Sequence, residues 1–219
     1  MIKLENVVKI YGSNESKTVA LDGVSLEIND GEMLAIMGAS GSGKSTMLNI
    51  IGAMDELTEG KYFYDDVEVN ALKGNKLHKF RKENVSFIFQ NFALMNDYTV
   101  YENVELPLLT KNISKKDRKK IVMEQLEVMG IKDLAKKFPT KISGGQQQRC
   151  AIARALASGN QLILADEPTG ALDRKTGEDI MEAFRRMNEL GKTVIIITHD
   201  ENVAEKCDRV IRISDGKIV

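Results

Sequence analysis

The feature that most constrains this chain is a glycine-rich segment between an apolar run and a helix-length stretch. Residues 33–37 are continuously apolar, residues 38–43 contain three glycines, and residues 45–53 have helical spacing of apolar side chains. A buried strand, a tight loop and a helix in that order are typical of α/β proteins with a parallel sheet. We therefore predict an α/β fold in which residues 33–37 form a central strand.

Other strands are expected at regular intervals along the chain. Val24, Leu26 and Ile28 alternate with polar residues, which indicates a strand with one buried face. Three further short runs, in which apolar residues predominate, fit strands buried on both faces, and helix-length segments separate them. These runs are residues 85–89, 162–165 and 194–198.

Residues 96–140 interrupt this alternation with a helical pattern, and we interpret them as an insertion within one domain that covers residues 1–219. Ser114 is a candidate helix N-cap with Asp117 three residues later, and Gly130 is a candidate stop. The expected apolar stripe consists of Val122, Leu126 and Met129. A basic cluster is interpreted as the solvated face opposite that stripe rather than as a binding patch. Its members are Lys115, Lys116, Arg118, Lys119 and Lys120.

Composition excludes several classes of protein. The 219 residues are 42% hydrophobic and 29% charged, an ordinary globular mixture, and 31 basic against 32 acidic residues leave a net charge of −1. This balance argues against binding to nucleic acid or an anionic lipid surface. Cys150 and Cys207 are interpreted as reduced thiols, and neither a bilayer-length apolar run nor a secretory signal is present. We expect a cytosolic chain that serves a membrane, if at all, through a partner.

The segment Gly38-Ala39-Ser40-Gly41-Ser42-Gly43-Lys44-Ser45 fits G-x-x-x-x-G-K-[ST] at every fixed position. Glycines let the loop curl so that successive N–H groups point at phosphate oxygens, and the following helix N-terminus assists. Lys44 is expected to reach the β- and γ-phosphates, and the Ser45 hydroxyl to ligate Mg²⁺. The alternative is a purely structural turn. The expected phosphate-binding residues are Gly38, Ser40, Gly41, Ser42, Gly43, Lys44 and Ser45.

A second element is an apolar run that ends in two carboxylates, Asp166 and Glu167. An aspartate at the carboxyl end of a central strand, beside a phosphate loop, is where hydrated Mg²⁺ needs a negative ligand. Glu167 is a candidate general base that polarises an attacking water. The alternative for Asp166 is the cap of a following helix.

A third element, Ser143-Gly144-Gly145-Gln146, opens a helix that runs to about Ala157. Backbone N–H groups and a hydroxyl at a helix start are a second place where an anion can bind. One nucleotide needs one phosphate loop. Either the chain binds two anions, or the second cradle serves a nucleotide bound by another copy.

Together these elements resemble the ATP-binding cassette (ABC) ATPases over nearly the whole chain. The residues that carry the resemblance are the phosphate loop, Gln90, Ser143 to Gln146, Asp166-Glu167, Ala171-Leu172-Asp173 and His199. The resemblance implies a P-loop NTPase fold with a parallel central sheet, a helical subdomain and an antiparallel β subdomain. It also implies a head-to-tail homodimer in which each ATP lies between the phosphate loop of one copy and the Ser143, Gly144, Gly145 and Gln146 segment of the other. The segment begins with Ile142, where the family usually has leucine.

Further roles follow from the resemblance alone. Tyr11 is similar to the aromatic residue that stacks on adenine, and Thr46 to the residue that touches the α-phosphate. Gln90 resembles the residue that meets Mg²⁺ and the attacking water and then senses the membrane partner. His199 resembles the γ-phosphate sensor, and Asp173 the residue that communicates across the dimer. The alternative for Tyr11 is a packed surface tyrosine.

The resemblance implies a separately encoded membrane permease, and hence a location at the cytoplasmic face of the cell membrane. Four segments are similar to a branch that contains macrolide-efflux, lipoprotein-release and antimicrobial-peptide-resistance ATPases, namely residues 89–94, 99–108, 146–149 and 165–173. An alternative is a regulatory role like that of the cell-division ABC ATPase, which acts through a permease without transport. A DNA-repair ABC protein is disfavoured because no sustained heptads follow the phosphate loop, and a translation factor because only one cassette is present. A kinase or GTPase would leave Ser143 and His199 unexplained.

Overall fold

The central sheet has six strands in the order β10-β9-β3-β8-β7-β6, and the computed structural model describes residues 1–12 and 16–219. All neighbouring strands are parallel except β10. The strands predicted at 33–37, 85–89, 162–165 and 194–198 are confirmed with small shifts of their ends. The strands of this sheet are β3 (Met33–Met37), β6 (Val85–Ile88), β7 (Leu162–Asp166), β8 (Thr193–Ile197), β9 (Arg209–Ser214) and β10 (Lys217–Ile218).

A second sheet is antiparallel and has the order β2-β1-β4-β5. The residue pattern predicted only the second half of β2, while the antiparallel unit was implied by the family resemblance and is confirmed. The strands are β1 (Ile2–Tyr11), β2 (Thr18–Ile28), β4 (Glu59–Tyr64) and β5 (Val67–Glu68).

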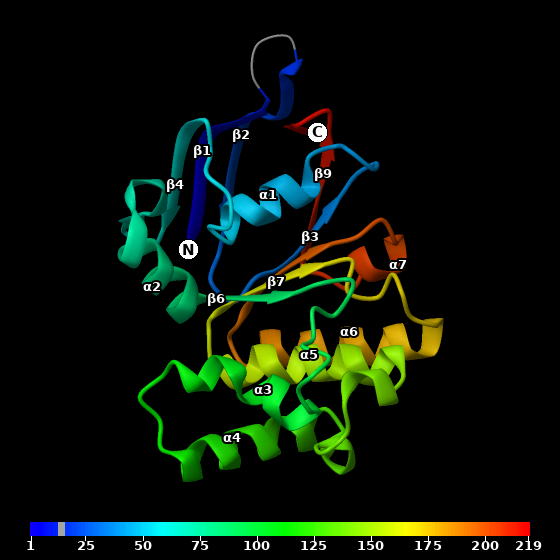
Figure 1. Cartoon of the computed structure of the whole chain (residues 1–219). Helices are drawn as coiled ribbons and strands as arrows, with labels where there is room; N and C mark the ends of the chain where they lie inside the picture. The colour runs from blue at the N-terminus through cyan, green and yellow to red at the C-terminus, as the bar shows by residue number, and fades with distance from the viewer. Residues whose placement is uncertain (13–15) are drawn as a thin grey trace.

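Helices cover both faces of the central sheet (Figure 1). Helix α1 lies between the two sheets, whereas α5 and α6 cover the opposite face of the central sheet. The helices are α1 (Lys44–Ile51), α2 (Gly74–Asn84), α3 (Val100–Leu109), α4 (Lys115–Val128), α5 (Gly144–Ser158), α6 (Arg174–Glu189) and α7 (Glu201–Ala204). The 3₁₀ turns that lie wholly within the described residues are Val69–Ala71, Lys132–Leu134 and Pro139–Lys141.

Two apolar cores are separated by the central sheet because successive side chains of a strand point to opposite faces. In β7, Leu162 and Leu164 pack with α1 and the antiparallel sheet, and Ile163 and Ala165 pack with α5 and α6. All four side chains are fully buried. The sheet is therefore rigidly held on both faces, and loops at its edges start from fixed points.

The insertion packs onto α5 through α3 and α4, as Figure 1 also shows. Ser114 caps α4 by accepting a hydrogen bond from the backbone N–H of Asp117, and Val122, Leu126 and Met129 are buried as predicted. The four lysines of the basic cluster are exposed. The fifth member differs from the prediction, since Arg118 is only 20% exposed and donates to Glu105 at 2.9 Å. This pair joins α4 to α3.

Among the described residues no helix combines the length and the apolar character needed to cross a lipid bilayer.

Candidate functional site

The predicted site residues follow the carboxyl ends of neighbouring parallel strands. Gly38 follows β3, Gln90 follows β6, Asp166 ends β7, and His199 lies two residues after β8. Because parallel strands end at the same edge of a sheet, these four segments meet along one edge. Ligands of open α/β sheets bind at this edge.

The loop at residues 38–43 requires glycine at two places where backbone approaches backbone. A Cβ atom on Gly38 would lie 2.2 Å from the carbonyl oxygen of Ile213, and one on Gly43 would lie 2.3 Å from that of Ala20. Both glycines have positive φ, 154° and 107°. Side chains at either position would force the loop open, so its curled shape depends on these glycines.

Two side chains of this loop fit an anionic ligand. The Lys44 ammonium donates to the carbonyl oxygens of Gly38 at 2.8 Å and Ala39 at 2.7 Å, which holds its charge at the loop. The Ser42 hydroxyl is buried, and the described part of the chain places no hydrogen-bond partner beside its oxygen. An unpaired buried hydroxyl is costly, and a phosphate oxygen would satisfy it. The loop is therefore suited to a polyphosphate.

The oxygen atoms of Ser45 and Asp166 lie side by side at the start of α1 and the end of β7. Ser45 Oγ is 3.3 Å from Asp166 Oδ2. Burial raises the pKa of Asp166, and the neighbouring Glu167 carboxylate acts in the same direction, whereas the Ser45 hydroxyl and Lys44 oppose the rise. A half-buried carboxylate with a raised pKa lacks compensating positive charge. A hard divalent cation that prefers hydroxyl and carboxylate oxygens fits this pair.

Glu167 and His199, whose roles were predicted separately, form one hydrogen-bonded pair. Glu167 Oε1 lies 2.8 Å from His199 Nδ1, and the side chains are 16% and 71% exposed. Glu167 has φ 46°, in the left-handed region, and its N–H donates to the carbonyl oxygen of Ile197 at 3.0 Å. Non-glycine residues rarely adopt this backbone conformation, and such strain concentrates at functional sites. The sheet edge therefore positions the mostly buried Glu167 carboxylate in hydrogen-bond contact with the exposed His199 imidazole.

Gln90 begins a loop that a partly buried arginine holds in place. The Gln90 side-chain amide lies against Gly170, where an added Cβ would be 3.1 Å from Nε2. The guanidinium of Arg154, in α5, donates to the carbonyl oxygens of Phe92 at 3.0 Å and Ala93 at 2.7 Å. Sequence reasoning missed Arg154, although an arginine in an otherwise apolar helical stretch was a possible signal. It ties the loop after Gln90 to the helix that Ser143 opens.

The Ser143 segment forms a separate cradle. Ser143 caps α5 through a reciprocal pair of hydrogen bonds with Gln146, at 2.9 and 3.3 Å. A Cβ on Gly144 would lie 3.6 Å from Phe92 and 3.9 Å from Leu172. This helix start therefore lies against the loops that contain Gln90 and Asp173, whereas the Lys44 loop lies against β2 and β9.

Asp173, rather than Asp166, is the residue that caps a helix after β7. Its carboxylate accepts from the N–H of Thr176 at 3.0 Å and from the Thr176 hydroxyl at 2.6 Å. These hydrogen bonds, the hydroxyl first, lower the pKa of Asp173. The alternative interpretation of Asp166 as a helix cap is wrong, and its carboxylate is left to the site.

Replacing Gly145 with alanine is expected to disturb the Ser143 helix start. The added Cβ would lie 2.5 Å from Cγ2 of Thr176, so the Thr176 methyl group or the helix start must move. We expect a loss of about 1 to 3 kcal/mol in the free energy of unfolding, measured by urea denaturation. Thr176→Ser removes that methyl group and keeps the hydroxyl that Asp173 binds, so the double variant should recover most of the loss. If the double variant is as unstable as Gly145→Ala, the contact with the Thr176 methyl group is not the cause of the loss.

Tyr11 and Thr46, expected near the adenine and the α-phosphate, lie at the end of β1 and in the first turn of α1. The Tyr11 ring is 40% exposed, and its hydroxyl donates to Asp55 Oδ2 at 2.6 Å. Burial raises the pKa of Tyr11, and a hydrogen bond with the Thr46 side chain opposes that rise. Tyr11 is therefore neither packed into the core nor free, and sequence reasoning missed the Asp55 contact.

Comparisons with known proteins identify the family. A family model described as "ABC transporter" matches residues 21–170. The chain is 49% identical to an uncharacterized ABC transporter ATP-binding protein, MJ0796, of Methanocaldococcus jannaschii, over all of this chain and 95% of that one. It is 44% identical to the macrolide export ATP-binding/permease protein MacB of Escherichia coli, of which it spans 34%. A dimeric post-hydrolysis structure of MJ0796, bound to ADP and Pi, has 48% identity and a TM-score of 0.92, and covers all of this chain and 96% of that one.

The matched model spans more than half of the chain. The carboxyl ends of the strands hold the Lys44 loop and the Asp166-Glu167 pair, and the separate helix start at Ser143 lies against the loops after β6 and β7. The chain belongs to the ABC transporter family, as an ATP-binding cassette of the ATPase type.

Proposed function

We propose that this chain works as one of two identical ATPase subunits that drive a separately encoded membrane permease. The observation that carries the proposal is the pair of cradles, because a single chain has one loop for a triphosphate at Lys44 and a second, separate helix start at Ser143. Two copies arranged head to tail would bring each Lys44 loop opposite the partner's Ser143 segment. Structures of MJ0796 that are described as dimeric, at 48 and 49% identity, support an assembly of two copies.

Each step of ATP hydrolysis can be given to residues around the Lys44 loop. Lys44 and the loop N–H groups would bind the β- and γ-phosphates. Ser45, Asp166 and Gln90 would hold Mg²⁺, which neutralises phosphate charge when bound. Glu167 would accept a proton from the attacking water, a step worth about 10² to 10⁴ in rate. His199, hydrogen-bonded to Glu167, would orient that carboxylate and contact the γ-phosphate.

A groove of about 370 Å³ offers a place for the permease. It is lined by Val85 and Phe87 of β6, Leu106 and Pro107 of α3, and Arg154 of α5. Arg154 also binds the loop after Gln90, so pressure in the groove would reach the nucleotide site. MacB, in which the matched segment is about a third of a longer ATP-binding/permease protein, supports a permease partner. The work would be export or displacement of peptides, lipids, lipoproteins or drugs at the cytoplasmic face of the membrane.

Leu106→Glu is the substitution that tests the permease. A charge in the groove would be desolvated by a docked apolar segment, so binding should weaken about tenfold or more. The affinity-tagged chain is purified with detergent from membranes of its own cells, and co-purifying membrane proteins are quantified. Val128→Glu, at an exposed position of α4 outside the groove, should retain the partner. Equal recovery with both variants, or no membrane protein with the unmodified chain, would contradict the proposal.

A further inference from the structure

A nearly buried lysine, an aspartate and the exposed tyrosine form a cluster that the assigned chemistry does not use. Lys9 is 9% exposed, and its ammonium donates to Asp55 Oδ1 and to the carbonyl oxygen of Glu56, both at 2.6 Å. A buried ammonium is costly unless it is paired in this way. Lys9 lies on β1, and Asp55 lies in the turn after α1. The pair therefore joins the antiparallel sheet to the end of the helix that starts at the phosphate loop.

The other carboxylate oxygen of Asp55 holds Tyr11. The Tyr11 hydroxyl donates to Asp55 Oδ2 at 2.6 Å, and the Lys9 ammonium lies 4.7 Å from the centre of the tyrosine ring. The hydroxyl end and one face of the ring are thus both fixed by charged groups. A flat ligand can stack only on the opposite face.

The charges around Asp55 keep it ionised and so keep it an acceptor. Burial alone would raise the pKa of Asp55, but hydrogen bonds from Lys9, Tyr11 and the N–H of Glu56 outweigh burial and lower it. Burial, followed by the hydrogen bond to Asp55, raises the pKa of Tyr11, so its hydroxyl stays a donor. Donor and acceptor roles are therefore fixed around neutral pH.

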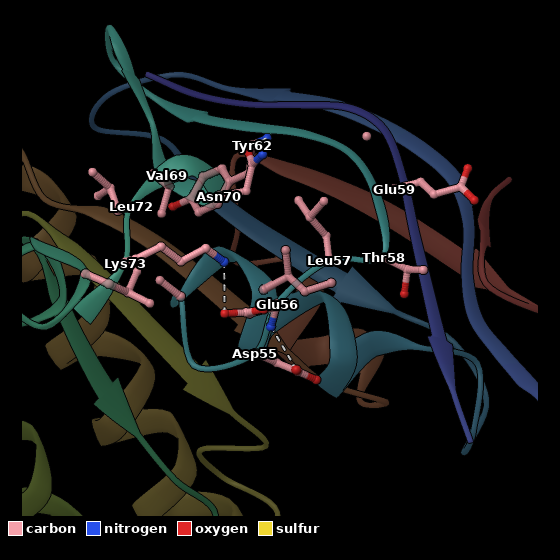
Figure 2. Close-up of a pocket in the computed structure, with 14 residues that line it drawn as sticks. Asp55, Glu56, Leu57, Thr58, Glu59, Tyr62, Val69, Asn70, Leu72 and Lys73 are labelled. Atoms are coloured by element: carbon pink, nitrogen blue, oxygen red, sulfur yellow. Dashed lines mark hydrogen bonds and ion pairs between the residues drawn. The ribbon is translucent and has the colours of Figure 1, made fainter. Parts of the chain in front are cut away.

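Asp55 is also anchored by the backbone of the residue that follows it. Figure 2 shows Asp55 at the edge of a pocket of about 280 Å³, with the N–H of Glu56 donating to Asp55 Oδ1 at 2.8 Å. On the same rim Lys73 donates to the exposed Glu56 carboxylate at 3.2 Å. The Lys73 pair does not touch Tyr11, so it provides a control.

We infer that Asp55, fixed by Lys9, is a positioning residue that sets the orientation of the Tyr11 ring for stacking on the nucleobase. This inference rests on the proposed role of Tyr11 in the nucleotide site. The phosphate loop binds any triphosphate, whereas the Asp55-held ring contributes binding only when a base is attached. The cluster therefore makes the site bind a nucleoside triphosphate more tightly than inorganic triphosphate.

Affinities for ATP and for inorganic triphosphate, measured by calorimetry on the full chain, test the inference. Tyr11→Phe keeps the ring but removes the hydroxyl that Asp55 binds, and it leaves the Lys9–Asp55 pair in place. We expect it to weaken ATP binding about threefold to tenfold and to leave triphosphate binding unchanged. Asp55→Ala should give a similar selective loss. The double variant should be no weaker than the poorer single variant, because both remove one interaction.

Controls separate the possible failures. Lys73→Met should bind both ligands as the unmodified chain does, and thermal melting shows whether Asp55→Ala, which leaves Lys9 with one partner fewer, still folds. Tyr11→Phe tests the inference without that risk. If Tyr11→Ala binds ATP as tightly as the unmodified chain does, Tyr11 does not contribute to nucleotide binding and its proposed role is wrong. Asp55 does not position the ring if Tyr11→Ala weakens ATP binding but Tyr11→Phe does not. The same conclusion follows if the losses of ATP affinity in Tyr11→Phe and Asp55→Ala add in the double variant.

Discussion

Glu167→Gln is expected to bind ATP as tightly as the unmodified chain and to hydrolyse it about 10² to 10⁴ times more slowly. Glutamine keeps the size of the side chain but cannot accept the proton of the attacking water. The carboxylate is 16% exposed and lies 2.8 Å from His199, so bulk water does not readily replace it. Phosphate release measures turnover, and equilibrium binding of ATP measures affinity. When hydrolysis is blocked, the ATP-bound dimer should also accumulate, because a ligand that binds one state stabilises that state. Light scattering detects this dimer by its doubled mass.

The matched control for this prediction is Glu189→Gln, which removes a carboxylate at the exposed end of α6. Its turnover should equal that of the unmodified chain. Turnover of Glu167→Gln within a few-fold of the unmodified chain would show that another group activates the water. A simultaneous loss of ATP affinity would instead show that the strained loop at Glu167 has rearranged.

The central strands and their loops could be predicted because each signal is local. An uninterrupted apolar run such as residues 162–165 needs burial on both faces, and the closely spaced glycines after β3 mark a tightly curled loop. β1 was missed for an equally physical reason. Its buried side chains are Ile2 and Leu4, and then Val7 and Lys9, so the alternation of two is displaced at an irregularity in the strand. Asn6 has a positive φ of 48° at this point.

The individual site residues could be predicted from motifs, but their partners could not. Asp55 and Tyr11 are 44 positions apart, and Glu167 and His199 are 32 apart, so no local pattern relates the members of either pair. Arg154 is similar, because an arginine in a helix is ordinarily solvated. Only the packing of α5 against the loop after Gln90 makes it a partly buried donor to two carbonyl oxygens.

Lys44→Ala is expected to abolish productive nucleotide binding. The loop carbonyls of Gly38 and Ala39 hold the Lys44 ammonium at the glycine-rich loop, and removal of one such donor costs about 10² to 10³ in rate at an oxyanion. Affinity for ATP and turnover should both fall by at least about 100-fold. Lys120→Ala, on the exposed face of α4, is the control and should change neither. If Lys44→Ala keeps the affinity and turnover of the unmodified chain, the proposed binding of phosphates by this loop is wrong.

Mixing two inactive variants tests most directly whether each active site is built from two copies of the chain. Lys44→Ala disables the loop cradle, and Ser143→Arg blocks the helix start that would face the partner's nucleotide. In a mixed dimer both lesions fall in one site, and the other site keeps an intact Lys44 and an intact Ser143. Each variant alone should be inactive, while an equal mixture should regain about one quarter of the unmodified turnover, because half of the dimers are mixed and each has one intact site. A mixture as inactive as its components, or full turnover by Ser143→Arg alone, would contradict the two-copy site.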